Sequence, residues 1–228
     1  MKKKKTIIIS IGGSLIVPDA IDTEFLSSLR ALLIRHMKKG TRFVLIAGGG
    51  KTCRRYQAAA AEVVHVSKND LDWIGIHTTR LNAHLLRTIF YPWAHAEVIK
   101  DPHRRANFRE PMLVTCGWKP GCSTDFDAVL FAKNHHGKIL VNLSNIDYVY
   151  TKDPRKHQDA SPIERIGWKE FRVMLPKKWD PGLNAPFDPI AAREAQKLSM
   201  TVAIMNGKNI KNLSNFLEEK PFTGTIIE

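Results

Sequence analysis

The stretch RFVLIAGGG, residues 42–50, decides the fold of this 228-residue chain. Its apolar run has no polar alternation, which is typical of a strand buried on both faces, and a helical segment follows the glycines from about residue 51. The stretch TIIISIGGS, residues 6–14, has the same strand-then-glycine form. Two buried strands that end in glycines, with helical segments between them, predict a parallel sheet covered by helices on both faces.

The rest of the chain continues this alternation of apolar strands and amphipathic helices. We expect strands at 111–116, 138–143, 201–205 and 223–228, and helices at 22–38, 70–90, 124–133, from Asp188-Pro189 and at 209–218. The helix at Asp188-Pro189 is predicted from an acidic N-cap followed by proline at the first helical position. The fold class is therefore α/β, with a mostly parallel sheet.

Composition excludes several classes of protein. No apolar run approaches the ~20 residues that a membrane-spanning helix needs, and the basic N-terminus MKKKKTIIISIGGSL leads into a strand rather than a signal peptide. Cys53, Cys116 and Cys122 are an odd number without CxxC spacing, so we expect no disulfide framework and a reduced cytoplasm. The 35 basic and 22 acidic residues give a net charge of +13, which predicts an anionic partner.

Three glycine-containing turns follow the predicted strands at one edge of the sheet. In a parallel sheet, ligands bind beyond the carboxyl ends of the strands, so the turns at 12–14 and 48–50 and the loop after 111–116 should meet in one crevice. The segment AGGGKT is not a P-loop, because Leu45 stands where that motif needs glycine. Glycines there either form a tight turn only or let the backbone approach a phosphate.

The stretch GWKPGCSTDFDAVLFA, residues 117–132, places a turn, two hydroxyls and an acid directly before a helix. One interpretation is capping by Ser123, Thr124 or Asp125, and the other is an anion site at the helix start. The segment NLSNIDYVYTKDP, residues 142–154, is either a surface loop or a nucleotide pocket formed around Tyr150 and Asp153. The histidines lack metal-ligand spacing, and no serine stands in a nucleophile-elbow sequence.

Taken in order, these segments resemble the amino acid kinase superfamily, and within it the archaeal-type UMP kinases. The resemblance is carried by ISIGGSLIVP (9–18), IAGGGKTCRRY (46–56), DWIGIHTTRLNAHLL (72–86), GWKPGCSTDFDAVLFA (117–132), NLSNIDYVYTKDPRK (142–156), FDPIAAREA (187–195) and TGTIIE (223–228). It implies a three-layer αβα sandwich formed by a single domain, 1–228. An acceptor-binding part would span about 1–135 and an ATP-binding part about 136–228.

The resemblance implies transfer of the ATP γ-phosphate to UMP, and it assigns residues to each substrate. The residues matched to ATP are Gly12, Gly13, Ser14, Gly49, Arg54, Ser144, Tyr150 and Asp153. Those matched to UMP are Gly48, Asp72, Lys119, Pro120, Gly121, Cys122, Ser123, Thr124 and Asp125. The catalytic candidates are Asp125, Arg54 and Lys119. Because the acceptor is an ionised phosphate oxygen, we expect Asp125 to orient donors or a metal and not to remove a proton.

The chain departs from the family pattern at several positions. Ser10 stands where many superfamily members carry a lysine two residues before the glycine pair. Archaeal-type UMP kinases also often lack this lysine, so its loss fits the subgroup and leaves a cationic role open. Lys119 or Lys51 is the candidate to supply the missing charge, and a solvated lysine is the alternative. Tyr148 replaces a usual glycine, and Trp118 either stacks on a base or packs inside the protein.

The resemblance also implies the partners and the alternatives. We expect ATP and UMP as substrates and Mg²⁺ as a cofactor, with no ligand predicted for the metal. We also expect a homo-oligomer, which is commonly a hexamer in this branch of the family. Neither a membrane nor a nucleic acid is expected as a partner. The rivals are a kinase of the same fold for another small phosphate or acid, and a non-catalytic nucleotide-binding or storage relative. Asp72 together with the PGxxTD sequence favours the UMP kinase. A nucleic-acid-binding module rests on charge alone.

Overall fold

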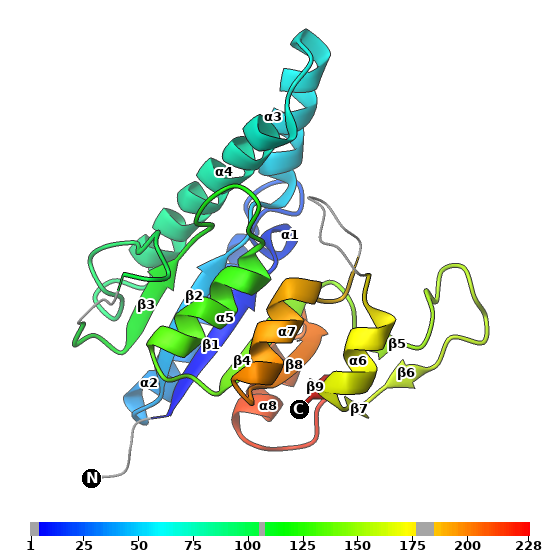
Figure 1. Cartoon of the computed structure of the whole chain (residues 1–228). Helices are drawn as coiled ribbons and strands as arrows, with labels where there is room; N and C mark the ends of the chain where they lie inside the picture. The colour runs from blue at the N-terminus through cyan, green and yellow to red at the C-terminus, as the bar shows by residue number, and fades with distance from the viewer. Residues whose placement is uncertain (1–4, 105–107, 177–184) are drawn as a thin grey trace.

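Five parallel strands form the centre of the computed structural model, which describes residues 5–104, 108–176 and 185–228. The sheet consists of β3 (Met112–Thr115), β2 (Arg42–Ala47), β1 (Thr6–Ile11), β4 (Ile139–Ser144), β8 (Thr201–Asn206), β9 (Thr225–Ile227) and β7 (Arg165–Ile166), in that order (Figure 1). β9 runs antiparallel to β8 at the far side of the sheet. A separate antiparallel ribbon joins β5 (Val149–Tyr150) to β6 (Pro162–Ile163).

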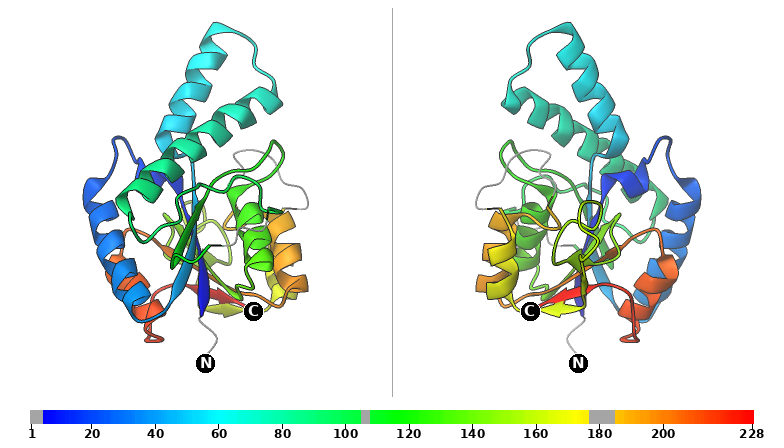
Figure 2. Two further views of the ribbon diagram at one scale, coloured as in Figure 1. Left: turned by 90° about the vertical axis from the view of Figure 1, so that its left-hand side faces the viewer. Right: turned by 90° about the vertical axis from the view of Figure 1, so that its right-hand side faces the viewer.

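Helices cover both faces of this sheet. They are α1 (Gly13–Ile16), α2 (Thr23–Lys38), α3 (Gly50–Val63), α4 (Lys68–Ile89), α5 (Thr124–Asn134), α6 (Trp168–Met174), α7 (Pro189–Lys197) and α8 (Ile210–Leu217). The edge-on views separate α2 and α8 on one side from α5, α6 and α7 on the other (Figure 2). The three-layer αβα sandwich predicted from the sequence is confirmed.

The central strands are apolar throughout because alternate side chains enter two different cores. Ile7, Ile9 and Ile11 pack in the core beneath α2, α4 and α8, while Ile8 packs in the core beneath α5 and α7. All four isoleucines are at most 2% exposed. A strand with one solvent-exposed face would carry polar residues at alternate positions, so both faces of this sheet must be covered by helices.

The predicted helices and strands are present with boundaries shifted by a few residues. The predicted cap of α7 is confirmed, because Asp188 accepts hydrogen bonds from the backbone N–H groups of Ile190 and Ala191. The last predicted strand is shorter than expected, since β9 covers only Thr225–Ile227. The ribbon β5–β6, the strand β7 and the short helices α1 and α6 were not predicted, because elements of two to seven residues are too short to leave a periodic pattern in a sequence.

The turns after β1 and β2 touch through their backbones, with no side chain between them. A Cβ atom added to Gly13 would lie 1.9 Å from the backbone nitrogen of Gly50, which itself has φ +70°. The Asn82 amide of α4 donates to the carbonyl oxygens of Gly48 (2.7 Å) and Gly49 (3.2 Å). Glycine is therefore required here by space at Gly13 and by a left-handed backbone at Gly50.

We predict that Gly13→Ala separates these two turns. The clash with backbone should lower the free energy of unfolding by about 2–3 kcal/mol and the Tm by roughly 5–10 °C. Thermal melts followed by circular dichroism would measure this change. Gly75→Ala in α4 is the control, because its added Cβ meets neighbouring atoms only at 3.5 Å or more. Equal Tm values for the two variants would contradict the packing argument.

Candidate active site

The carboxyl ends of the five parallel strands bring the predicted segments to one edge of the sheet. The Gly12 N–H donates to the carbonyl of Leu143 (2.8 Å), which joins the turn after β1 to the end of β4. The Gly48 N–H donates to the carbonyl of Ile11 (2.9 Å), which joins the turn after β2 to the end of β1. The two glycine turns and the end of β4 are therefore joined to one another by backbone hydrogen bonds, beside the start of α3, where a helix N-terminus favours an anion.

Helix α4 holds the loop that follows β3, which we call the acceptor loop (residues 117–123). The Gly117 N–H donates to Thr79 Oγ1 (2.8 Å), and the Gly121 N–H donates to Asp72 Oδ2 (2.9 Å). Thr79 lies two turns beyond Asp72 on the same side of α4. The structure thus brings together two segments, at residue 72 and in the acceptor loop, that the sequence matched separately to UMP.

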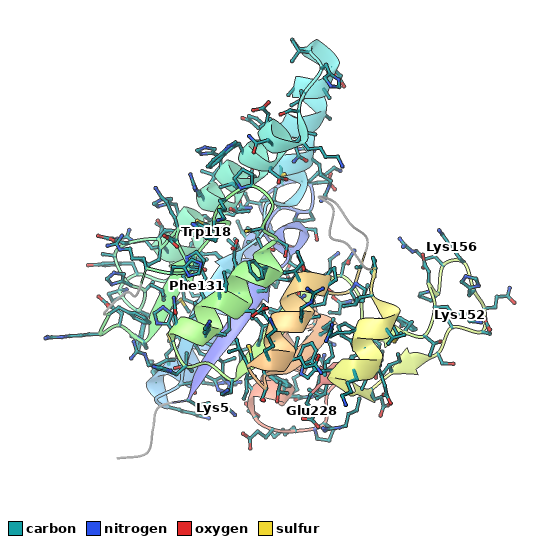
Figure 3. The ribbon with its side chains drawn as sticks, viewed as in Figure 1. Lys5, Trp118, Phe131, Lys152, Lys156 and Glu228 are labelled. Carbon is teal, nitrogen blue, oxygen red and sulfur yellow. The ribbon has the colours of Figure 1, made fainter. Side chains whose placement is uncertain are left out.

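The peptide of Trp118 is held from both sides by charged side chains. Asp127 Oδ2 accepts its N–H (3.1 Å), and Arg80 Nη2 donates to its carbonyl oxygen (3.3 Å). Figure 3 shows Trp118 on the loop between α4 and α5. Sequence reasoning did not identify Arg80 or Asp127, because each acts on a backbone group that is distant along the chain.

The start of α5 combines both interpretations of GWKPGCSTDFDAVLFA. Ser123 is the N-cap, since its hydroxyl accepts the Phe126 N–H (3.1 Å), and the same hydroxyl donates to Asp188. Asp188 in turn caps α7. The two helix starts are therefore joined by one hydrogen bond, and both direct their positive ends toward this region.

Asp125 lies between these helix starts and the ends of β1 and β4. Its carboxylate accepts hydrogen bonds from Asn142 Nδ2 (3.2 Å), from the Asp188 N–H (3.3 Å) and from Ser10. All three donors are neutral. Burial, and then the charge of Asp188, raise the pKa of Asp125 to about 7. Ser10 donates to this carboxyl without supplying a positive charge to compensate it.

Asp127 is fully buried beneath the acceptor loop. Burial is the main cause that raises its pKa to about 7, and the charges of Asp125 and Asp188 add to the effect. Its Oδ1 receives no hydrogen bond from the described part of the chain. A carboxyl held in this way costs stability, and such groups gather at functional sites.

The three cations proposed from the sequence differ in their surroundings. Lys51 pairs with Asp19 in the loop after α1. Arg54 is exposed on α3 and forms no hydrogen bond or ion pair with the described residues. The Lys119 ammonium lies 3.9 Å from the centroid of the Trp118 ring. Of the two candidates for the missing lysine, only Lys119 lies on the acceptor loop.

A cleft of about 500 Å³ opens at the end of β4. Ser144, Tyr150 and Asp153, the three residues matched to the adenosine part of ATP, all line it, and so does Tyr148. Arg155 binds both oxygens of Asp153 (3.1 Å each) and lowers the pKa of that carboxyl. The loop that follows β5 carries Lys152 and Lys156 and extends away from the sheet (Figure 3).

The described residues contain no cluster of three His, Cys, Asp or Glu side chains that could hold a metal ion. Within the same residues, no helix is long and apolar enough to cross a membrane. All three cysteines are free thiols, and burial raises the pKa of Cys116 and of Cys122 to about 11. These thiols are therefore poor nucleophiles.

Glycine turns, two joined helix starts and a nucleotide-sized cleft at one sheet edge define a phosphate-handling α/β protein. The chain belongs to the amino acid kinase family, whose model matches residues 5–104 and 110–206. It is 32% identical to the uridylate kinase of Thermoplasma volcanium over 98% of each chain, and 30% identical to that of Sulfolobus acidocaldarius over 92% of this chain and 93% of that one. The crystal structure of uridylate kinase from Archaeoglobus fulgidus superposes with a TM-score of 0.83 at 26% identity, over 97% of this chain and 99% of that one.

We predict that Asp127→Asn stabilises the protein at high pH. The folded pKa lies above the ordinary value, so the folded protein keeps a proton that the unfolded chain has lost, and stability falls as pH rises from about 4 to 7. Asparagine cannot ionise. The gain in Tm over wild type should therefore grow with pH, and at pH 8 it should be about 4 °C or more larger than at pH 5.

Thermal melts at both pH values test this expectation. Asp153→Asn is the control, because Arg155 lowers the pKa of Asp153 and removal of its charge gives no gain at pH 8. A Tm difference between Asp127→Asn and wild type that is the same at pH 5 and pH 8 would show that Asp127 is not a buried acid with a raised pKa.

Proposed function

We propose that this protein is an ATP-dependent UMP kinase that produces UDP. The observation that carries the proposal is the bond between the acceptor loop and Asp72, at the edge where the glycine turns meet. Full-length similarity to uridylate kinases supports the same substrate. A storage or binding relative need not keep Asp72 with the PGxxTD sequence, so the non-catalytic alternative is less favoured.

The acceptor half of the site comprises residues up to about 135. Asp72 would hold the nucleoside of UMP, and residues 119–125 with Gly48 would surround its phosphate. The N–H groups at the start of α5 point into this loop, where a helix start stabilises an anion. The UMP phosphate is already ionised near neutral pH, so the site must align two anions and needs no general base.

The donor half comprises residues from about 136 onward, together with the glycine turns. Gly12, Gly13, Ser14 and Gly49 would contact the ATP phosphates through backbone groups. Ser144, Tyr150 and Asp153 would line the pocket for adenine and ribose. Arg54 on α3 is an exposed guanidinium without a protein ion pair among the described residues, and it would neutralise phosphate charge during transfer.

Mg²⁺ would enter with ATP, and the residues present fit it. Mg²⁺ in kinases is held by one or two carboxylates together with phosphates, so a cluster of three protein ligands is not required. Asp125 and Asp188 supply two adjoining carboxylates, and the charge of Asp188 raises the pKa of Asp125. A divalent cation would offset that repulsion. When bound, it neutralises charge on the phosphates.

The proposal also covers the cellular compartment, the oligomeric state and the attraction of the substrates. We place the protein in the cytoplasm because its three cysteines are free thiols without metal-ligand spacing. We expect a homo-oligomer, as is common in this branch of the family. The positive charge of the chain would draw both anionic substrates toward the site.

A coupled assay of ADP release tests the proposed activity. With ATP and Mg²⁺, we expect UMP to give the highest kcat/KM in a panel with CMP, dUMP, isopentenyl phosphate, carbamate and glutamate. Turnover of another acceptor without UMP would identify a different kinase of this fold. ATP binding with no turnover would favour a storage relative, and salt-sensitive RNA binding without kinase activity would favour the nucleic-acid alternative.

We predict that Asp125→Asn lowers kcat by about a hundredfold, because donors or metal at the reacting phosphates lose their orientation. The variant should remain folded, since asparagine does not place a charge in the site. Measurements of kcat and Tm separate these effects. Asp22→Asn, at the N-cap of α2, is the control and should keep normal kcat. A near-normal kcat for Asp125→Asn would remove Asp125 from the catalytic residues.

A further inference from the structure

Trp118 and Lys119 are two neighbouring residues of the acceptor loop that the family pattern does not explain. The Trp118 ring is half-buried, and the Lys119 side chain is exposed. Both follow Gly117, whose N–H is fixed to α4 through Thr79. Both lie between the end of β3 and the start of α5, in the loop that we propose surrounds the phosphate of UMP.

The backbone of Trp118 has a fixed orientation. Asp127 accepts the N–H and Arg80 donates to the carbonyl oxygen of the same residue, so the peptide groups on both sides of its Cα are held. The two side chains come from different helices, α5 and α4. Rotation of the first of these peptides would leave the buried Asp127 carboxyl without its hydrogen bond from Trp118, which is costly.

The ring of Trp118 is also held. The His103 ring packs edge-on against it, with 4.9 Å between the ring centroids and 64° between the planes. The Lys119 ammonium lies 3.9 Å from the ring centroid, well within the range of a cation–π interaction. Among the described residues, Lys119 Nζ forms no hydrogen bond and no ion pair, and its ammonium contacts the Trp118 ring.

The site around Asp125 lacks a positively charged group from the described part of the chain, which indicates a role for the contact between Lys119 and Trp118. The donors to Asp125 are neutral, and Ser10 occupies the place where many family members carry lysine. Two polyanionic substrates need a cation at this edge. A free lysine loses rotamer entropy when it is ordered by a ligand, and a prior contact with a ring reduces that loss.

We propose that Trp118 is a positioning residue that holds the Lys119 ammonium over the acceptor loop, ready to bind the phosphate of the acceptor. The inference rests on the proposed function and names the cation that replaces the missing lysine. An ammonium against one ring face still has N–H groups for phosphate oxygens. The fixed Trp118 peptide and the His103 contact keep the ring in place.

Four variants test the inference: Trp118→Leu, Trp118→Phe, Lys119→Met, and the double variant Trp118→Leu/Lys119→Met. We expect Trp118→Leu to lower kcat/KM for UMP roughly threefold to tenfold, and Trp118→Phe to stay within about twofold of wild type. Lys119→Met should lower it at least as much as Trp118→Leu. The double variant should equal Lys119→Met, because the ring acts through the lysine. The KM for ATP should not change in any variant.

The affinity for UMP, measured by titration calorimetry, provides a readout that does not depend on turnover and should follow the same order. Lys133→Met is the control, since Lys133 is an exposed lysine in the last turn of α5. Additive losses in the double variant, equal losses in KM for ATP, or a gain in kcat/KM from Trp118→Leu would overturn the inference while UMP kinase activity stands. A wild-type protein that neither binds nor phosphorylates UMP would overturn the proposed function and this inference together.

Discussion

Direct contact between the backbones of Gly13 and Gly50 is the constraint on which the rest of this structure depends. The turns after β1 and β2 approach so closely that no side chain fits between them. Asn82 fixes the second turn to α4, and the Gly12 N–H fixes the first to the end of β4. The ends of three strands are therefore held at one place, beside the start of α3, and a helix start is a suitable place for a phosphate.

The acceptor loop is held almost entirely through its main chain. Thr79, Arg80 and Asp127 bond to backbone groups of Gly117 and Trp118, so their contacts do not depend on which side chain the loop carries at position 118. This arrangement explains how a loop can keep its course while its side chains change. It also leaves those side chains available to face a ligand.

Two buried carboxyl groups at the candidate site lower the stability of the folded protein. Burial raises the pKa of both Asp125 and Asp127, and each carboxyl is surrounded by neutral donors or backbone groups. A stable core would replace such acids with apolar side chains, so their presence indicates that the charges serve the chemistry. The same deficit of positive charge makes a lysine on the acceptor loop useful.

The sequence by itself determined the central strands and the helices on both faces of the sheet, because uninterrupted apolar runs, glycine turns and an Asp-Pro cap are local signals, and it predicted the edge at which a ligand would bind. It did not reveal the β5–β6 ribbon, whose strands are too short for a pattern, or the roles of Arg80 and Asp127. The sequence pattern indicates only that Arg80 is an arginine within a helix and that Asp127 is an acid in the first turn of a helix. Only the tertiary structure decided that both bond to the Trp118 peptide, since hydrogen bonds between residues 9 and 38 positions apart depend on how the chain folds back on itself.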